Sequence, residues 1–163
     1  MKKVLDKLPE GLRNTAFVRL FGLTKVPMIF WLRPTVVELS DEVTAIKIPL
    51  SRRSKNHLNS MYFGALACGA DLAGGFAAMK KTMDKGKRVS LAFKEFHAEF
   101  LKRAEGDTVF TCTQGKEIDA FVEKVLASDE RHNLPLDIIA TCPDVSGDEP
   151  VAKFTITLSL KRK

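Results

Sequence analysis

The segment Met61–Met79 constrains the fold of this chain most, because it is an apolar stretch of helical length that is rich in small residues. Its interior contains Gly69, Gly74 and Gly75, and each glycine inside a helix costs about 1 kcal/mol relative to alanine. Such a helix needs tertiary packing to compensate, and close approach of another backbone is the usual reason. We therefore predict a central helix wrapped by a sheet. Asp71, the one carboxylate of this segment, should lie partly desolvated, where a charge is either paired or functional.

The rest of the chain carries strand and helix signals in an order typical of an α+β fold. Residues 1–33 and 116–126 have apolar positions at helical spacing, which predicts an N-terminal helical extension and an inserted helix. A parity switch near Lys94 and Glu95 indicates a β-bulge. The order predicts one domain in which a curved antiparallel sheet wraps the central helix. Alternating apolar residues predict the strands at Thr35–Leu39, Val43–Leu50, 87–105, Thr108–Thr113, Leu136–Cys142 and Val151–Leu160.

The net charge of the chain is +6, and its lysines and arginines occur in clusters. Such a surface favours an anionic partner, namely a phosphorylated cofactor, an acidic carrier protein or nucleic acid. The sequence has no zinc finger, aromatic RNA-binding motif or basic recognition helix, which argues against nucleic acid. No apolar run reaches the roughly 18–20 residues of a membrane span, and the N-terminus lacks an apolar signal core. We therefore expect a cytoplasmic protein without a membrane partner.

The cysteines and histidines give no indication of a metal site. The three cysteines are scattered without CxxC spacing, which favours reduced thiols over a disulfide framework or a zinc site. No pair of the three histidines has the spacing of metal ligands. The sequence therefore predicts neither a metal nor a disulfide.

The order of elements, together with the residues from Asn56 to Asp71, resembles the hot-dog-fold thioesterase superfamily. The similarity covers roughly residues 35–160, and the nearest group is the PaaI type together with the YiiD C-terminal domain. In that pattern an Asn, a Thr or Ser, a His-Gly-Gly step and an acidic residue follow one another. The matching positions here are Asn56 for the Asn, Ser60 for the Thr or Ser, Gly64 for the second Gly and Asp71 for the acidic residue.

Two positions depart from this pattern at the expected start of the central helix. Tyr62 stands where the family commonly has His, and Phe63 stands where it has the first Gly. Phe63 keeps a backbone N–H but adds bulk. The N-terminal helical segment and the inserted helix are further departures from the minimal fold. The resemblance therefore implies the fold more directly than it implies the catalysis.

The resemblance implies hydrolysis of acyl-CoA or acyl-carrier-protein thioesters by a homodimer or a dimer of dimers. Asp71 would act as general base toward water or as a direct nucleophile, and Asn56 of the other subunit would hold the water or the substrate. The first-turn amides of Phe63 and Gly64 would bind the oxyanion, because such amides have no partner inside the helix. Ser60 would be the N-cap of the helix.

Basic residues near the strands are candidates for the phosphates of coenzyme A, which belongs to the substrate, so no separate cofactor is expected. This nomination rests on charge and position alone. The candidates are Lys87, Arg88, Lys102 and Arg103.

Each assignment has an alternative that the residues themselves leave open. Asp71 could be a structural carboxylate bonded to backbone or to a basic side chain, and Asn56 a local cap in a turn. Tyr62 is a pocket wall or, more simply, a core aromatic. The chain as a whole could be a non-catalytic module that binds acyl thioesters or serves assembly. A hydratase or dehydratase of the same fold would need a His–acid pair, for which His57 is the local candidate.

Overall fold

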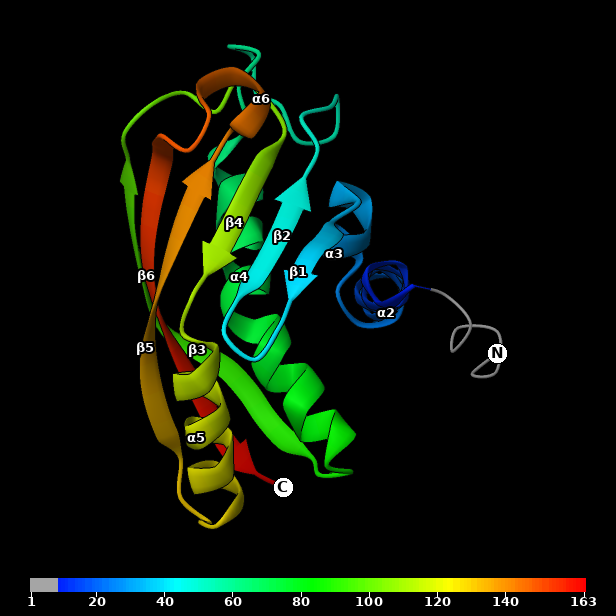
Figure 1. Cartoon of the computed structure of the whole chain (residues 1–163), viewed down its shortest axis with the longest axis vertical. Coiled ribbons are helices and arrows are strands. Elements are labelled where there is room, and N and C mark those ends of the chain that lie inside the picture. Colours follow the sequence, from blue (N-terminus) through cyan, green and yellow to red (C-terminus); the bar gives the residue numbers. More distant parts are fainter. Residues whose placement is uncertain (1–8) are drawn as a thin grey trace.

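The computed structural model describes residues 9–163, so the first eight residues of the predicted N-terminal extension lie outside the described part. Six strands form one antiparallel sheet in the order β1-β2-β4-β5-β6-β3 (Figure 1). This arrangement confirms the predicted α+β fold. The strands are β1 (Thr35–Leu39), β2 (Thr44–Ile48), β3 (Val89–Phe100), β4 (Thr108–Cys112), β5 (His132–Thr141) and β6 (Pro150–Arg162).

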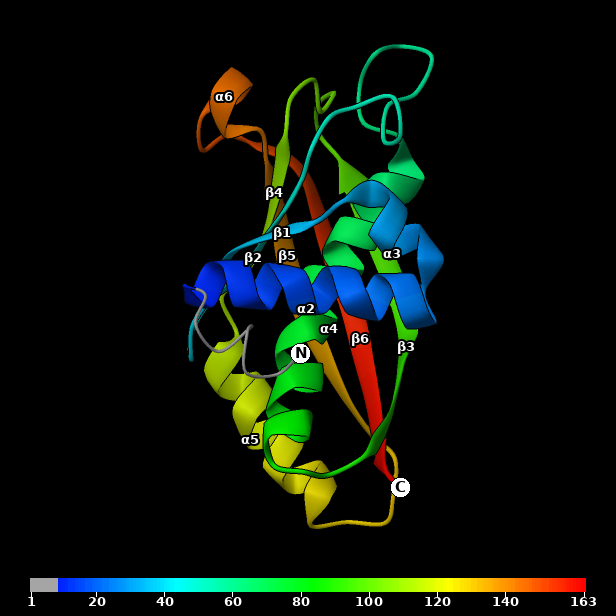
Figure 2. The ribbon, with the colours of Figure 1, turned by 90° about the vertical axis from the view of Figure 1, so that its right-hand side faces the viewer.

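The long helix α4 (Phe63–Asp84) lies between the sheet and the N-terminal helix α2 (Glu10–Lys25). Figure 2 shows α2 crossing in front of α4, and the rings of Phe17 and Phe76 meet there with centroids 5.9 Å apart. Thirteen of the helix's residues are buried, so α4 supplies the centre of the hydrophobic core. None of the helices in residues 9–163 is both long and apolar enough to cross a bilayer.

The glycines of α4 allow the sheet to approach the helix, although through side chains and not through backbone as predicted. A Cβ atom at Gly69 would lie 2.2 Å from the ring of Phe110 on β4. A Cβ atom at Gly74 would lie 2.4 Å from the side chain of Ile156 on β6. Both neighbours are fully buried, so the missing methyl groups are filled by core side chains of the sheet.

The strand β3 forms one edge of the sheet and pairs only with β6 among the described strands. Its register shifts between Phe93 and Glu95, which confirms the predicted bulge. The strand is antiparallel to α4 in its path, because it begins just after the helix ends and returns along it (Figure 1). This path decides which residues reach the two ends of the helix.

Several boundaries differ from the prediction for local reasons. The helix α4 begins at Phe63, where Tyr62 is the N-cap residue without a side-chain cap, so the prediction of Ser60 as N-cap is wrong. The helix also continues past Met79 to Asp84. The strand β5 begins at His132, since its pairing with β6 extends past Pro135, a residue that hides strand character in the sequence.

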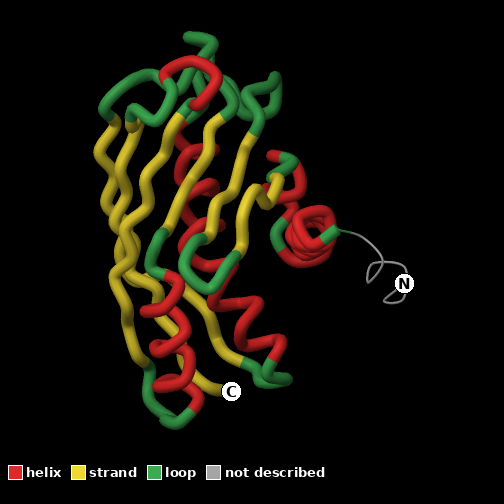
Figure 3. The backbone as a smooth tube through the Cα atoms, in the orientation of Figure 1, coloured by secondary structure: helices red, strands yellow, loops and turns green. Residues whose placement is uncertain are grey.

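Three further helices complete the described part of the chain. The predicted inserted helix is confirmed as α5 (Gly115–Leu126), which packs against α4 and the sheet through its apolar face. The N-terminal extension continues after α2 with the short helix α3 (Pro27–Leu32), and a further short helix, α6 (Pro143–Ser146), was not predicted. The loops after β2 and β3 lie at the same end of the sheet as α6 (Figure 3), and this end also holds the start of α4.

Candidate functional site

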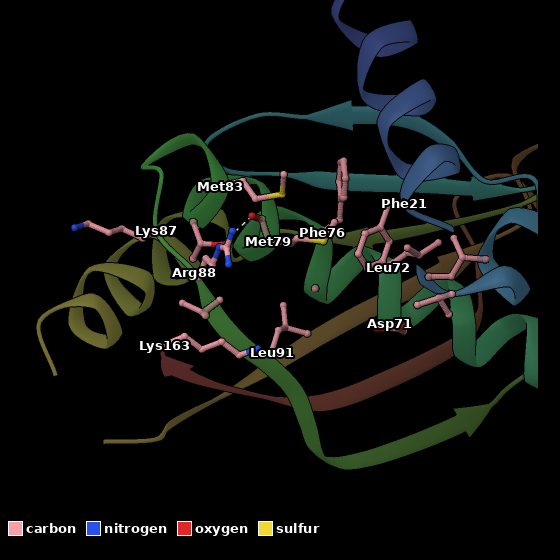
Figure 4. A pocket seen from close by; sticks show the side chains of 15 residues that line it. Phe21, Asp71, Leu72, Phe76, Met79, Met83, Lys87, Arg88, Leu91 and Lys163 are labelled. Carbon is pink, nitrogen blue, oxygen red and sulfur yellow. Dashed lines mark hydrogen bonds between the residues drawn. The ribbon is translucent and has the colours of Figure 1, made fainter. Parts of the chain in front are cut away.

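Asp71 opens into a cavity of about 480 Å³ between α4, the first residues of β3 and the N-terminal helices (Figure 4). The size falls within the range of small-molecule sites, about 300–1,000 Å³. Most of the lining is aliphatic or aromatic. The lining residues are Phe21, Val26, Ile29, Asp71, Leu72, Gly75, Phe76, Met79, Thr82, Met83, Lys87, Arg88, Val89, Leu91 and Lys163.

Burial in this apolar cavity raises the pKa of Asp71 from its ordinary value of 3.8 to about 6. Within residues 9–163 no hydrogen bond or ion pair reaches the carboxylate. The interpretation of Asp71 as a bonded structural carboxylate therefore has no support in the described part of the chain. A partly desolvated carboxylate without a partner is typical of a general base or a nucleophile.

Gly75, one helical turn after Asp71 on α4, has no side chain that could fill the space next to the carboxylate. A Cβ atom at this position would lie 3.7 Å from Oδ1 of Asp71 and 3.1 Å from the ring of Phe93. The carboxylate oxygen therefore faces the space that a larger side chain would fill. This glycine keeps the cavity open directly next to the carboxylate.

Because the pKa of Asp71 is raised, we expect this residue to lower the free energy of unfolding as the pH rises. The unfolded carboxyl loses its proton near pH 3.8, whereas the folded one keeps it until about pH 6. The buried charge therefore costs nothing below pH 3.8 and its full penalty above pH 6, roughly 2–3 kcal/mol. Urea unfolding of the wild type and Asp71→Asn at pH 4 and pH 7.5 checks this. The variant should match the wild type at pH 4 and exceed its stability at pH 7.5; equal stability at both values would contradict the burial of the charge.

The neighbouring thiol does not offer a second nucleophile. Burial, together with the negative charge of Asp71, raises the pKa of Cys68 to about 11. The thiol therefore stays protonated near neutral pH, and the thiolate is the reactive form of cysteine. The effect of Asp71 on Cys68 reflects their positions three residues apart, on one face of α4.

The start of α4 presents backbone amides and two exposed rings. The backbone N–H of Leu66 donates to the carbonyl of Tyr62 at 3.1 Å, so the amides of Phe63 and Gly64 precede the first bond of the helix. The ring of Tyr62 covers Gly64, where a Cβ atom would lie 2.6 Å from Cε1. Tyr62 and Phe63 are 49% and 61% exposed, so the interpretation of Tyr62 as a core aromatic is wrong.

Asn56 shapes the loop before α4. Its Oδ1 accepts hydrogen bonds from the backbone N–H of Leu58 at 2.9 Å and of Ser60 at 3.3 Å. The hydroxyl of Ser60 also donates to this oxygen, which explains why Ser60 is buried here and does not cap the helix. In the described chain Asn56 therefore acts as a local cap of its loop, as the alternative interpretation predicted. The side-chain nitrogen Nδ2 of the half-buried Asn56 forms no hydrogen bond within residues 9–163.

One chain does not bring the amides of the helix start and Asp71 onto the same carbonyl group. Gly64 and Asp71 are seven residues apart on a straight helix, which corresponds to roughly 10 Å along the axis. A carbonyl within hydrogen-bond distance of the amides is out of reach of that carboxylate.

The four cations nominated for coenzyme A do not form one cluster. Lys87 and Arg88 line the cavity near the C-terminal end of α4, where the backbone N–H of Lys163 donates to the carbonyl of Arg88. Lys102 and Arg103 lie at the other end, beside the helix start, since the carbonyl of Ala104 accepts from the N–H of Met61. The 22 residues of α4 separate the two pairs by roughly 30 Å. The two pairs lie at opposite ends of α4 because β3, which connects them, runs antiparallel to that helix.

A second, strongly basic pocket of about 450 Å³ lies between the N-terminal helices and the β2–α4 loop. In the sequence only the adjacent Arg52 and Arg53 indicated positive charge here. That Arg19, Arg33 and Lys47 line the same pocket could not be predicted from their positions in the chain. The guanidinium of Arg53 stacks over the ring of Trp31 at 4.6 Å. The pocket is lined by Arg19, Arg33, Thr35, Lys47, Pro49, Ser51, Arg52 and Arg53.

Histidines and metal ligands do not contribute to the described cavity. None of the three histidines belongs to the lining around Asp71, so a His–acid pair for hydratase chemistry has no support there. Residues 9–163 contain no group of three or more His, Cys, Asp or Glu side chains that could hold a metal ion.

The family model described as "Domain of unknown function (DUF4442)" matches residues 13–160. The chain belongs to the DUF4442 family. No curated protein matches this DUF4442 protein in sequence.

Solved structures with the same architecture come from several bacteria. A protein of unknown function from Chlorobaculum tepidum has a TM-score of 0.79 at 12% identity, and the match covers 94% of this chain and 97% of that one. A probable thioesterase from Pseudomonas aeruginosa has a TM-score of 0.71 at 21% identity, with 96% and 97% covered. A thioesterase from Haemophilus influenzae has a TM-score of 0.65 at 10% identity, with 96% and 93% covered. The sheet order and these likenesses confirm the hot-dog fold of this DUF4442 protein.

Proposed function

We propose that this DUF4442 protein hydrolyses acyl thioesters and that Asp71 is its catalytic carboxylate. The observation that carries the proposal is a carboxylate without a hydrogen-bond partner in residues 9–163, facing an apolar cavity of about 480 Å³. The thioesterase names of the structures from P. aeruginosa and H. influenzae support the same class of reaction. Acyl-CoA and acyl-carrier protein are the candidate substrates.

Asp71 can act in thioester hydrolysis by one of two routes. As a general base it takes a proton from water, whose oxygen attacks the thioester carbon, and the carbon–sulfur bond then breaks while the proton passes to the leaving thiolate. As a nucleophile it forms an acyl anhydride that water hydrolyses in a second step. Both routes require the ionised carboxylate. With the pKa of this group raised to about 6 by burial, it is ionised and more basic than an ordinary aspartate at neutral pH.

The oxyanion would be held by the amides of Phe63 and Gly64 from a second copy of the chain. These amides lie at the positive end of the α4 dipole, where a developing negative charge is stabilised. Removing one donor of this kind typically costs about 10²–10³ in turnover. The side-chain amide of Asn56 lies in the loop at the same end, and we propose that it holds the water or the thioester. Tyr62 and Phe63 would form the rim of this subsite.

The surface around β3 supports assembly into a homodimer or a dimer of dimers. The strand leaves a 12-residue edge without a partner among the described strands. Long unpaired edges are usually paired or covered in native proteins. Apolar side chains that are about half exposed lie along or beside this edge, namely Phe96, Phe100 and Leu101. Pairing of two such edges would cover them.

A mixed-variant experiment tests whether the site is shared between two chains. Asp71→Asn removes the carboxylate, and Gly64→Val forces a side chain into the Tyr62 ring at the helix start. Neither variant alone should release thiol. Co-expression should restore about a quarter of wild-type activity, because half of the dimers are mixed and each mixed dimer keeps one intact site. No restoration, with mixed dimers shown by mass, would place the whole site in one chain.

At this end of the molecule Lys102 and Arg103 are the proposed contacts for the phosphates of coenzyme A. Lys102 already pairs with Glu149, so Arg103 is the freer of the two cations in the described chain. The three cysteines are buried free thiols, which suits the reducing cytoplasm that we propose as the location.

The proposal is tested by free-thiol release from short-, medium- and long-chain acyl-CoAs and from one acyl-carrier protein. Release with any of these substrates is expected. No release with any of them would overturn it. Binding of an acyl-CoA without turnover would then favour the second candidate, a non-catalytic module, for which Tyr62 and Phe63 in place of the family's His and Gly are the supporting observation.

A further inference from the structure

The cavity that holds Asp71 has two chemically different ends. Asp71 lies at one end, and Lys87, Arg88 and Lys163 line the other (Figure 4). Between the ends the lining is apolar, except for Thr82. The hydroxyl of Thr82 is buried and donates to the helix carbonyls of Ala78 and Met79, at 3.0 and 2.8 Å. A ligand that fills the cavity therefore meets a carboxylate, an apolar passage and then positive charge.

The length of the passage suits a medium-length chain. The cavity follows α4 from Asp71 to Met83, which are twelve residues and roughly 18 Å apart along the helix axis. An extended chain advances roughly 1.2 Å per bond, so this distance corresponds to about 15 bonds. The side chain of Arg88 reaches into part of this length. A chain of about eight to twelve carbons would connect the two ends.

The cations at the far end differ from their neighbours, because no acidic side chain of the described residues pairs with them. The nearby lysines of α4 and its C-cap are compensated by partners: Lys80 by Asp84, Lys81 by Asp119 and Lys85 by Glu123. Lys87, Arg88 and Lys163 form no ion pair within residues 9–163. Basic side chains that line the end of an apolar passage without an acidic side chain to pair with are complementary to an anionic ligand group.

The apolar passage fits an acyl chain better than the pantetheine arm of coenzyme A. That arm contains two amide groups, and amides placed in apolar surroundings without hydrogen bonds are costly. The side chains of the passage supply no free hydrogen-bond donor, since Thr82, the one hydroxyl among them, already donates to the helix. The passage therefore favours methylene groups between the thioester and the positive end.

We propose that the acyl group of the substrate carries a second, terminal carboxylate, so that the protein acts on ω-carboxyacyl thioesters. The distal carboxylate binds at Arg88, with Lys163 lining the same end, while the thioester lies at Asp71. This inference rests on the proposed thioesterase function, and it adds the chemical class of the acyl group. Arg88 is its central residue because a guanidinium binds a carboxylate through two parallel hydrogen bonds.

The test compares two CoA thioesters of equal length, decanoyl-CoA and its ω-carboxylated analogue. We expect the wild type to show a kcat/KM at least about tenfold higher for the ω-carboxylated substrate, as a charge-assisted hydrogen bond predicts. Arg88→Met should lower kcat/KM for that substrate about tenfold more than for decanoyl-CoA. Lys85→Met is the matched control, because Lys85 is a nearby cation that pairs with Glu123 and does not line the cavity. This control should keep the wild-type preference.

Two kinetic outcomes would overturn the proposal. Equal or better turnover of decanoyl-CoA by the wild type would show that the positive end does not select a carboxylate. A rise in KM by the same factor for both substrates in Arg88→Met would mean that this end binds the phosphates of coenzyme A.

A binding experiment keeps the inference separate from the thioesterase proposal. Calorimetric titration of the wild type and Arg88→Met with decanamide and its ω-carboxylated analogue needs no turnover. We expect the carboxylated amide to bind at least about tenfold tighter to the wild type, and this advantage to disappear in Arg88→Met. Even if no acyl thioester is hydrolysed and the proposed function fails, this titration still tests whether the cationic end of the cavity binds a carboxylate. Equal binding of the two amides by the wild type would overturn it.

Discussion

Asp71→Asn is expected to lower the turnover of acyl thioesters by about 10²–10⁴-fold, the range in which a positioned general base contributes. Asparagine has nearly the same shape as aspartate, but it neither accepts a proton near neutral pH nor attacks a carbonyl carbon. The variant should fold, because no hydrogen bond or ion pair within residues 9–163 depends on the carboxylate. Free-thiol release at saturating substrate measures the effect. The rate of the wild type should rise with pH through about 6, where the buried carboxyl ionises.

Asp84→Asn is the matched control for this substitution. Asp84 is the last residue of the same helix, its carboxylate is exposed, and it pairs with Lys80. Its replacement removes one negative charge without touching the cavity, so turnover should stay near that of the wild type. An Asp71→Asn enzyme as fast as the Asp84→Asn enzyme would exclude Asp71 from the chemistry.

Gly69→Ala is expected to destabilise the protein by about 1–3 kcal/mol, although alanine is the better helix former. The added methyl group would lie 2.2, 2.4 and 2.5 Å from three atoms of the Phe110 ring. That ring is fully buried and packs near Phe154, so it has no free space into which to move. Thermal and urea unfolding measure the change. For a chain of this size, each kcal/mol corresponds to about 2–4 °C in Tm.

Gly75→Ala separates helix propensity from overpacking on the same helix. Its added methyl group would meet the tip of the Phe93 ring at 3.1 Å, and this ring is only partly buried. A small shift of the ring accommodates the methyl group. The substitution should therefore be neutral or stabilise the protein by up to about 1 kcal/mol. Equal destabilisation by both substitutions would mean that the sheet does not constrain Gly69 more than Gly75.

The fold was largely predictable from local sequence patterns. The small residues of the segment that became α4 indicated a tightly wrapped helix, and the alternating segments around it indicated the strands. The parity switch near Lys94 and Glu95 located the bulge of β3 because a pleated strand has a strict two-residue period. The start of α4 was predicted two residues early. A capping pattern in the sequence does not reveal that Asn56 binds the hydroxyl of Ser60 and removes it from the helix end.

The candidate site was predictable only in part. Asp71 could be singled out as a desolvated carboxylate because its neighbours along the helix are apolar and mostly small. The role of Asn56 in the loop, and the exposure of Tyr62, depend on residues that are brought together by the turn before α4. The basic pocket was hidden for the same reason, since Arg19 and Arg52 are far apart in the sequence.

The sequence by itself determined that one apolar helix with a single carboxylate would lie at the centre of an antiparallel sheet. Residue periodicity is a local property, and it encodes which elements form and which faces they bury. The tertiary structure decided what surrounds Asp71. Because β3 returns along α4 in the opposite direction, it carries Lys87 and Arg88 to one end of the helix and Lys102 to the other. The positions of the charges in the sequence do not predict this path. Only the packing of the sheet against the helix creates a cavity with two chemically different ends.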